Sequence, residues 1–406
     1  MKKIILSGKR PLSGRVEISG SKNAALPIIF ASVITRGVSI IENAPDIGDV
    51  SVALRLIEML GAKSERIGST LHIDTRNMHY SAPDRALMAE IRASTYLLGA
   101  ELSRFGIFEY ADFGGCSFSP RPIDMHITAA RAFGAEERGG FLLADRLLGC
   151  ELNFDKVSVG ATVNSLIMAA AADGTTVIRG GAREPHVLCL VDYLRSAGAY
   201  IDVSDGVFTV TGGELSGGRV RVIGDMIEAG TYLAAGLITD GEVTVSGICP
   251  DELFSFLPVL YGLGADISTE RSELTVRRRG QGAGLALRAE PYPGFPTDLQ
   301  PIAAPLMAFS AGGVIVDRVW RGRFGYLSAL ARQGVISRSL EGCAIIGKSR
   351  IKKAAVTAPD LRGGAASLLC ALAADGESEI NNAEIIYRGY ERIEEKLSSL
   401  GADIKL

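Results

Sequence analysis

The sequence is poor in several residue types that mark particular classes of protein. Its four histidines, and six cysteines without a CxxC pair, provide neither a zinc-ligand cluster nor a disulfide framework. We therefore expect no metal, no cofactor and a reducing cytoplasm as the compartment. Lys and Arg total 43 against 46 Asp and Glu, and this slightly acidic balance argues against nucleic acid as a partner.

Long apolar runs are also missing. The apolar stretch behind the two N-terminal lysines spans only residues 4–6, too short for the core of a signal peptide. No later segment reaches the roughly 18 uninterrupted apolar residues of a membrane span. We expect no membrane contact, and nothing in the sequence implies an obligate protein partner.

The composition is that of a globular protein, with 47% hydrophobic and 22% charged residues over 406 positions. That length predicts two or three domains. Aromatic residues make up only 6%, whereas glycines number 48. This combination favours many turns and helices that pack closely through small side chains.

One unit recurs six times along the chain. A glycine followed by a small residue ends an amphipathic stretch at Gly61, Gly134, Gly198, Gly264, Gly334 and Gly401. Apolar residues recur at three- and four-residue steps before each glycine, which predicts a helix closed by a left-handed residue.

Each unit contains a second helix that is apolar on nearly all sides, as in residues 164–174 and 300–313. Such helices are buried. Short extended runs such as residues 242–248 and 313–319 predict strands, so one unit is expected to run strand, buried helix, strand, amphipathic helix, hairpin. Two α/β halves of three units each fit the length, and a cleft between such halves is the default ligand site.

A phosphate-loop pattern, GCAIIGKS at residues 342–349, is rejected. A phosphate loop follows a buried strand and opens a helix, whereas residues 343–346 are β-prone and no helical periodicity follows before Pro359. The register of the repeat places this segment in the hairpin of the fifth unit.

Two other segments carry candidate chemistry. Lys22 in GSKNAALP enters an otherwise apolar helix at its N-terminus, where a cation is unfavourable unless an anion binds there. Cys116 and Arg121 lie in DFGGCSFSPRPIDMH, a loop with a glycine pair and two prolines. A nearby arginine favours the thiolate, so Cys116 is either a reactive thiol or a structural cysteine in a turn.

Further charged residues stand at corresponding places in other units, several of them just before helices. A recurrence of Lys and Arg at helix starts suits phosphates and carboxylates. The members are Arg92, residues 156–160, Asp298, Arg323, Arg362 and Arg388.

The motifs GSKNAALP, GGCS, RPIDMH, DKVSVGAT, AREP, FPTD, PDLR and RGYERIEEKL follow in order over essentially the whole chain. In this combination the sequence closely resembles the UDP-N-acetylglucosamine 1-carboxyvinyltransferases, a group of enolpyruvyl transferases. The resemblance implies two inside-out α/β barrel domains, each of three βαβαββ units around buried helices. It also implies that the N-terminal strand joins the second domain, which gives domains of residues 21–223 and 1–20 plus 224–406 with the active site in the cleft between them.

The activity implied is transfer of the enolpyruvyl group of phosphoenolpyruvate to the 3-hydroxyl of UDP-N-acetylglucosamine, with release of phosphate, early in peptidoglycan and cell-wall synthesis. By the same resemblance Cys116 is a proton donor and Asp298 a candidate general base, and both are catalytic together with Lys22 and Arg388. The residues implied to bind phosphoenolpyruvate are Lys22, Asn23, Arg121 and Arg388. Those implied to bind the nucleotide sugar are Asn23, Arg92, Arg121, Pro122, Ile123, Asp124, Met125, Lys156, Val157, Ser158, Val159, Asp298 and Val319.

The chain departs from the family pattern at Trp320-Arg321-Gly322, where an acidic residue and Asn are usual before the Arg of the RF pair, and at Tyr387, where Asp is usual. Three readings therefore stay open. The acceptor is UDP-N-acetylglucosamine, or the chain is an enolpyruvyl transferase of the shikimate-pathway or secondary-metabolite type, or it is a non-catalytic paralogue that binds a nucleotide sugar. The last should have lost Lys22, Cys116, Asp298 or Arg388, and all four are present.

Overall fold

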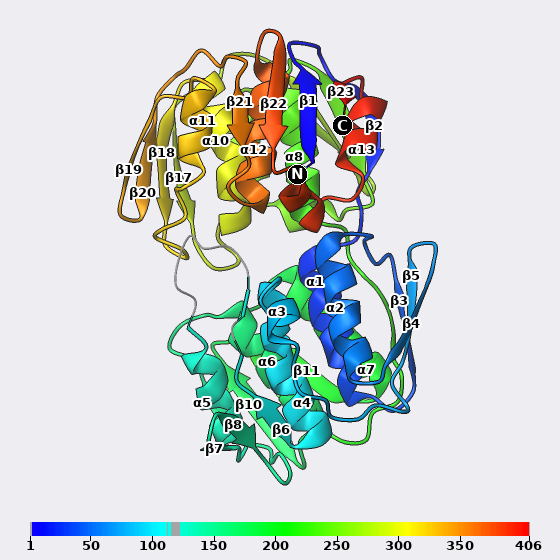
Figure 1. Cartoon of the computed structure of the whole chain (residues 1–406). Coiled ribbons are helices and arrows are strands. Elements are labelled where there is room, and N and C mark those ends of the chain that lie inside the picture. The colour runs from blue at the N-terminus through cyan, green and yellow to red at the C-terminus, as the bar shows by residue number, and fades with distance from the viewer. Residues whose placement is uncertain (1, 112, 115–121, 406) are drawn as a thin grey trace. The chain divides into compact units, whose positions relative to one another are not determined.

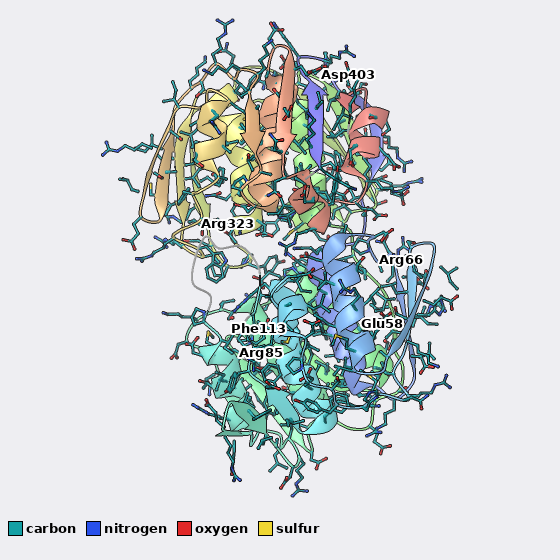
Figure 2. All side chains as sticks on the ribbon, in the orientation of Figure 1. Glu58, Arg66, Arg85, Phe113, Arg323 and Asp403 are labelled. Atoms are coloured by element: carbon teal, nitrogen blue, oxygen red, sulfur yellow. The ribbon has the colours of Figure 1, made fainter. Side chains whose placement is uncertain are left out.

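A computed structural model of the chain describes residues 2–111, 113–114 and 122–405 (Figure 1). The chain forms two compact units, which we call the terminal unit (Met1–Ser19 and Gly224–Leu406) and the middle unit (Gly20–Ile223). Each unit has its own continuous core of buried apolar side chains. Charged side chains point outward over the surfaces of both units (Figure 2).

The terminal unit contains three four-stranded sheets around three central helices. The central helices are α8 (Met226–Ile238), α10 (Gln300–Phe309) and α12 (Leu361–Ala373). The first sheet has the order β21-β22-β1-β23, from β1 (Lys3–Ser7), β21 (Ala355–Thr357), β22 (Glu377–Asn381) and β23 (Asp403–Lys405). The second has the order β15-β16-β14-β2, from β2 (Ser13–Glu17), β14 (Glu242–Ser246), β15 (Ala265–Glu270) and β16 (Glu273–Arg278). The third has the order β17-β18-β20-β19, from β17 (Leu285–Ala289), β18 (Gly313–Asp317), β19 (Ser337–Leu340) and β20 (Cys343–Ile346).

Amphipathic helices cover these sheets. They are α9 (Leu257–Gly262), α11 (Leu327–Arg332) and α13 (Ile393–Ser399). Short 3-10 helices connect the elements: η3 (Pro250–Leu253), η4 (Thr297–Leu299) and η5 (Ala383–Arg388). The rejected phosphate-loop segment contains β20 of the β19–β20 hairpin, as the repeat predicts, and the next element is the strand β21 and not a helix.

The middle unit repeats this plan around three central helices, α1 (Lys22–Ala31), α4 (Leu97–Phe105) and α6 (Val159–Ala171). One sheet has the order β13-β3-β5-β4, from β3 (Val38–Glu42), β4 (Lys63–Ile67), β5 (Thr70–Asp74) and β13 (Arg219–Arg221). Another has the order β11-β12-β10-β9, from β9 (Glu151–Asn153), β10 (Thr175–Arg179), β11 (Tyr200–Ser204) and β12 (Val207–Thr211). The third has the order β6-β8-β7, from β6 (Ile107–Glu109), β7 (Glu136–Arg138) and β8 (Phe141–Leu143). The remaining helices are α2 (Gly48–Met59), α3 (Arg85–Met88), α5 (Asp124–Ala132) and α7 (Pro185–Ala197), with η1 (Ser32–Ile34) and η2 (Arg92–Tyr96).

The repeat predicted from the sequence is confirmed at its helix ends. All six repeat glycines follow the amphipathic helices with positive φ, between 88° at Gly61 and 120° at Gly198. Side chains with a Cβ rarely adopt this backbone conformation, which is why glycine recurs there. The helices predicted to be buried are the six central ones, and the fold class is confirmed as α/β.

The second unit of the repeat departs from this plan. In the other units a leading strand pairs in parallel with the strand that follows the central helix. In the second unit the described residues before α4 form the short helix α3 in place of that leading strand, so the β6-β8-β7 sheet has three strands. Pro83 disfavours sheet pairing, and the Asp84 carboxylate caps α3 by accepting a hydrogen bond from the Leu87 N–H at 3.0 Å.

No helix in the described part of the chain combines the length and the apolar character needed to cross a bilayer.

Candidate active site

Aspartates stand at the start of all three central helices of the terminal unit. Asp225 caps α8 by accepting hydrogen bonds from the N–H groups of Ile227 and Glu228, at 2.8 and 3.1 Å. Asp360 caps α12 in the same way. Asp298 lies in η4, immediately before α10. Carboxylates at these positions are stabilised by the unpaired N–H groups and the dipole of the helix.

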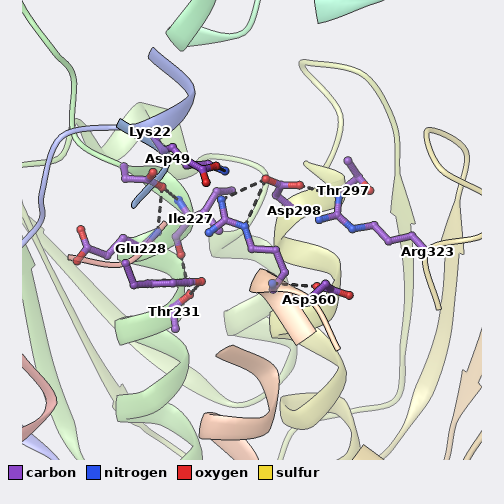
Figure 3. Close-up of polar contacts among 12 residues, drawn as sticks. Lys22, Asp49, Ile227, Glu228, Thr231, Thr297, Asp298, Arg323 and Asp360 are labelled. Atoms are coloured by element: carbon purple, nitrogen blue, oxygen red, sulfur yellow. Dashed lines mark hydrogen bonds and ion pairs between the residues drawn. The ribbon is translucent and has the colours of Figure 1, made fainter. Parts of the chain in front are cut away.

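Asp298 is held by two buried guanidinium groups (Figure 3). Its Oδ1 lies 2.6 Å from Arg323 Nη1, and its Oδ2 lies 3.2 Å from Arg362 Nη2. The arginine side chains are 8% and 3% exposed, whereas that of Asp298 is 27% exposed. The carboxylate is therefore the accessible member of an otherwise buried cluster.

A relay of hydrogen bonds connects this cluster to the loop after β18. Arg323 Nη1 donates to Thr297 Oγ1 at 3.2 Å, and that hydroxyl donates to Asp317 Oδ2 at 2.6 Å. The other oxygen of Asp317 accepts hydrogen bonds from the N–H groups of Val319 and Trp320. The predicted site residue Val319 is therefore held in place through Asp317, to which sequence reasoning assigned no role.

Arg362 retains hydrogen-bonding capacity inside the unit. Its Nη1 atom is buried and has no hydrogen-bond partner among the described residues. The guanidinium lies over the ring of Tyr390, 5.4 Å from the centroid, and Tyr390 hydrogen-bonds Thr231 at 2.9 Å. Arg388 ends η5, where it is half-buried.

Basic residues stand at the starts of the central helices of the middle unit. Lys22 is the first residue of α1, and its Nζ lies 3.1 Å from Asp49 Oδ2 in a largely buried pair. Arg92 begins η2, which leads into α4, and its guanidinium lies over the ring of Phe113 at 5.8 Å. Lys156 is exposed just before α6. The sequence prediction that cations recur at helix starts thus holds in this unit.

Most of the other predicted nucleotide-sugar residues lie at three helix starts. Pro122 and Ile123 precede α5, which Asp124 and Met125 open. Asn23 lies in the first turn of α1. Val157 is exposed before α6, which Ser158 caps and Val159 begins. A helix start offers unpaired N–H donors, so these positions suit an anionic ligand.

Two residues that sequence reasoning missed border this group. His126 follows Met125 directly and is buried, and its Nδ1 lies 2.7 Å from Nδ2 of the buried Asn164 on α6. Burial lowers the pKa of His126 to about 4, with the Arg92 charge adding to the effect and the Asp124 charge opposing it. The available signal was a histidine directly after RPIDM.

Two predicted residues, Cys116 and Arg121, lie outside the described residues. Of the others, the structure brings Asp298 together with Arg323 and Arg362 in the terminal unit, and it pairs Lys22 with Asp49 in the middle unit.

Comparison with known proteins places the chain in a family. The family model for EPSP synthase (3-phosphoshikimate 1-carboxyvinyltransferase) matches residues 6–397. The chain belongs to this family of enolpyruvyl transferases. The resemblance stated from the motifs is thereby confirmed, and the protein is a transferase by descent.

Curated relatives match along the full length of this enolpyruvyl transferase. It is 39% identical over 412 residues to UDP-N-acetylglucosamine 1-carboxyvinyltransferase 3 of Caldanaerobacter subterraneus subsp. tengcongensis, covering 100% of this chain and 99% of that one. It is 40% identical over 414 residues to UDP-N-acetylglucosamine 1-carboxyvinyltransferase of Clostridium botulinum, with the same coverage.

Solved structures share the fold. The enolpyruvyl transferase NikO from Streptomyces tendae matches with a TM-score of 0.89 and 26% identity, covering 99% of this chain and 98% of that one. EPSP synthase from Acinetobacter baumannii matches with a TM-score of 0.73 at 18% identity, covering 100% of both chains, which bears on the fold alone.

Proposed function

We propose that this enolpyruvyl transferase moves the enolpyruvyl group of phosphoenolpyruvate to the 3-hydroxyl of UDP-N-acetylglucosamine and releases phosphate, an early step of peptidoglycan synthesis. The observation that carries the proposal is the identity of 39–40% over the whole chain to relatives named for this activity. The five described cysteines are thiols, which is consistent with a cytoplasmic enzyme.

In the proposed reaction, the sugar oxygen bonds to C2 of phosphoenolpyruvate while C3 gains a proton, and the sugar hydroxyl loses its own. The C2–O bond to phosphate then breaks and C3 gives up a proton, which restores the double bond. Cys116 is proposed as the donor of the C3 proton, by resemblance. Asp298 is proposed to accept the hydroxyl proton, because its carboxylate is the accessible member of a cluster whose arginines fix its orientation.

The anionic groups of both substrates need fixed positive charge. Phosphoenolpyruvate carries a phosphate and a carboxylate, for which we propose Lys22, Asn23, Arg121 and Arg388 as the binding residues. Asp49 holds Lys22 at 3.1 Å, so the ammonium group is positioned before any anion arrives. For the nucleotide sugar we propose the residues at the starts of α5 and α6 together with Asn23, Arg92, Arg121, Asp298 and Val319.

A second candidate is transfer to a different nucleotide. The Trp320-Arg321-Gly322 segment favours it, because this segment follows Val319 at the proposed sugar site. The charge change itself lies on the surface: the Arg321 side chain is 75% exposed, and its Nη1 lies 3.6 Å from Oε1 of Glu341, which is 83% exposed. An exposed pair of this kind contributes little and is screened by solvent, so we rank UDP-N-acetylglucosamine first.

The deciding experiment measures phosphate release from phosphoenolpyruvate with UDP-N-acetylglucosamine, beside shikimate 3-phosphate and UMP as separate acceptors. We expect release with the first alone. Release with another acceptor alone would establish the second candidate. Binding of UDP-N-acetylglucosamine without release from any acceptor would instead support a non-catalytic role.

A further inference from the structure

One surface of the terminal unit is strongly basic, although the chain as a whole is slightly acidic. Residues 332–353 contain six Lys and Arg against one acidic residue, Glu341. All six cations are exposed, and no described carboxylate forms an ion pair with any of them. Exposed arginines elsewhere do pair, as Arg76 does with Asp74 at 2.6 Å. The six unpaired residues, which we call the basic edge, are Arg332, Arg338, Lys348, Arg350, Lys352 and Lys353.

Hydrogen bonds hold the two stretches that carry these cations side by side. The Gly347 N–H donates to Ile336 O at 2.8 Å, and the Ile336 N–H donates to Ser349 Oγ at 2.9 Å. The Lys352 N–H donates to Gln333 O at 2.9 Å. The segment after β20 therefore lies against the segment before β19, and the cations of both belong to one surface.

Exposed apolar side chains alternate with charge along this surface. Every second residue of an extended chain points to the same face, and here those residues are Ile336, Arg338 and Leu340. The two aliphatic side chains, Ile336 and Leu340, are 65% and 53% exposed. Ile345 pairs with Arg338 across the hairpin and is also exposed, whereas the neighbouring Ala344 is fully buried. The outer face thus presents an apolar, basic, apolar pattern.

The backbone of β19 is open on one side. The strand ends its sheet, and β20 is its single neighbour among the described strands (Figure 1). The outward N–H and C=O groups of an edge strand can pair with an added strand. One charged side chain is enough to discourage pairing between like edges. Six unpaired cations do more, because they also attract a segment of opposite charge.

This surface lies away from the candidate active site. The Ser349 N–H donates to Ala308 O at 2.8 Å, near the C-terminal end of α10, whereas Asp298 precedes the N-terminal end of that helix. The helix between them spans about 15 Å. Substitutions in the basic edge therefore do not alter the contacts of the candidate catalytic groups.

The observations favour a peptide over other anionic partners. A single nucleic acid strand stacks its bases on aromatic side chains, and residues 332–353 contain none. An anionic membrane would attract the cations, but a strand edge pressed into lipid leaves backbone N–H and C=O groups unpaired. An extended acidic peptide satisfies the charge, the apolar contacts and the backbone together.

We propose that the basic edge is a docking surface for an acidic, extended segment of a partner protein, which adds to β19 as a further strand. The carboxylates of that segment pair with the cations, and its apolar residues cover Ile336, Leu340 and Ile345. This interaction goes beyond the proposed enzymatic function and does not depend on it.

The probe is a synthetic peptide, Glu-Leu-Ser-Glu-Ser-Leu-Glu, whose alternation complements that of the edge. Two matched peptides each change one property. Lysine in place of every glutamate reverses the charge, and proline in place of both serines removes two backbone N–H groups. Binding to the full chain is measured by fluorescence anisotropy, and hydrogen exchange reports protection of the β19 amides. Vesicles of anionic phospholipid are the parallel probe for a lipid surface.

Two protein variants locate the binding. Arg338→Glu reverses the charge at the centre of the apolar, basic, apolar pattern. Arg55→Glu on α2 is the matched control, because Arg55 is likewise exposed and has no ion pair among the described residues. Thermal unfolding establishes that each variant is folded, and phosphate release is expected to be unchanged in both.

We expect the acidic peptide to bind the wild-type protein and to slow exchange across Ser337–Leu340. Arg338→Glu should weaken its binding about 5-fold or more, because repulsion replaces attraction, whereas Arg55→Glu should stay within about 2-fold of the wild type. The lysine and proline peptides should each bind the wild type at least about 5-fold more weakly. Raising the salt concentration from about 50 mM to about 0.5 M should weaken binding of the acidic peptide.

Failure of the acidic peptide to bind at about 1 mM would overturn the inference, as would equal binding to Arg338→Glu and Arg55→Glu. Equal affinity for the proline peptide would overturn strand addition, since that peptide keeps the charge and loses backbone donors. Binding to vesicles that Arg338→Glu abolishes, without peptide binding, would assign the surface to lipid and overturn the proposal. If no acceptor supports phosphate release, the proposed function fails, while the peptide measurements still decide this inference.

Discussion

Glu101 carries a buried carboxyl group whose Oε2 atom has no hydrogen-bond partner among the described residues. It lies on α4 beside apolar side chains that include Leu56, Met88 and Leu97. Burial raises its pKa to about 8, with the charge of Glu109 adding to the effect. In the unfolded chain the Glu101 carboxyl group titrates near its ordinary pKa of 4.5. Between about pH 4.5 and 8 the folded chain therefore binds more protons at this group than the unfolded chain does.

This difference predicts a pH dependence of stability. Between about pH 4.5 and 8 the folded state holds a proton on Glu101 that the unfolded state has lost, so the contribution of this group to the free energy of unfolding falls as pH rises. The fall is at most about 1.4 kcal/mol per pH unit. Glu101→Gln removes the titration. We expect urea unfolding to find this variant gaining stability relative to the wild type from pH 5 to pH 8.

The control for that measurement is Glu136→Gln, on the exposed strand β7. It removes an exposed carboxylate whose ion pair with Arg138 is screened by solvent, and so reports the effect of the substitution itself. A stability difference between Glu101→Gln and the wild type that stays constant over this pH range would contradict a buried, protonated Glu101.

Asp298 shows the opposite way to keep a carboxyl group inside the fold. Two guanidinium groups contact its oxygens at 2.6 and 3.2 Å, so its charge is paired where that of Glu101 is not. The sequence motif FPTD identified Asp298, because a family pattern marks residues that chemistry requires. No local pattern identified Glu101, because its burial depends on elements far apart in the sequence.

At the scale of elements, the six repeat glycines predict a graded response to alanine. Gly401 has φ +97° and open space around it, so Gly401→Ala should cost only the backbone strain, about 1–2 kcal/mol. Gly61 has φ +88°, and a Cβ there would lie 2.8 Å from His79 Nδ1 and 3.0 Å from the Asn77 carbonyl oxygen. Gly61→Ala should cost at least about 1 kcal/mol more, because the contact adds to the strain.

Chemical denaturation of both variants measures these costs. Gly280→Ala serves as the control, since a Cβ there meets no atom within 4 Å and its backbone is not in the left-handed region. We expect its stability to stay within about 0.5 kcal/mol of the wild type. Equal losses at Gly401 and Gly280 would show that the positive φ is not what selects glycine at the helix ends.

The sequence predicted the central helices, the glycine caps and the β19–β20 hairpin because each is set by local periodicity or local backbone geometry. It did not predict helix α3 in place of a leading strand, where Pro83 and Asp84 outweighed the repeat. Nor could it place Asn164, because the partners of that amide, Thr95, Gly99 and His126, come from other helices. Such contacts are tertiary, and a single sequence carries no periodic signal for them.

At the scale of the whole molecule, the chain passes twice between its units, and each passage separates a strand from the helix that follows it in sequence. Strand β2 precedes α1 in sequence but pairs in parallel with β14, whereas β13 precedes α8 but pairs in parallel with β3. Hydrogen bonds join the two connecting segments on either side of the unit boundary. In the terminal unit the Asp225 N–H donates to Ser19 O at 2.9 Å, and in the middle unit the Ser21 N–H donates to Ile223 O at 2.7 Å. The middle unit is continuous in sequence from Gly20 to Ile223, whereas the terminal unit needs a segment from each end of the chain.

Strand β1 makes the terminal unit depend most strongly on distant sequence. It lies between β22 and β23 near the other end of the chain (Figure 1), in the position that β5 occupies between β3 and β4 in the middle unit. Leu6 on β1 and Leu71 on β5 are both fully buried. Leu6→Ala and Leu71→Ala thus remove a buried leucine side chain from equivalent strands, one of which comes from the chain terminus and the other from a local hairpin.

We expect each variant to lose about 2–5 kcal/mol, the usual range for removing a buried leucine side chain. The loss of stability should be confined to the unit that carries the substitution. Hydrogen exchange measured by mass spectrometry should speed up in β21, β22 and α12 for Leu6→Ala, and in β3 and β4 for Leu71→Ala, because each unit has a separate core. If either substitution accelerates exchange equally in both units, the two cores form one cooperative structure, and the units do not unfold independently.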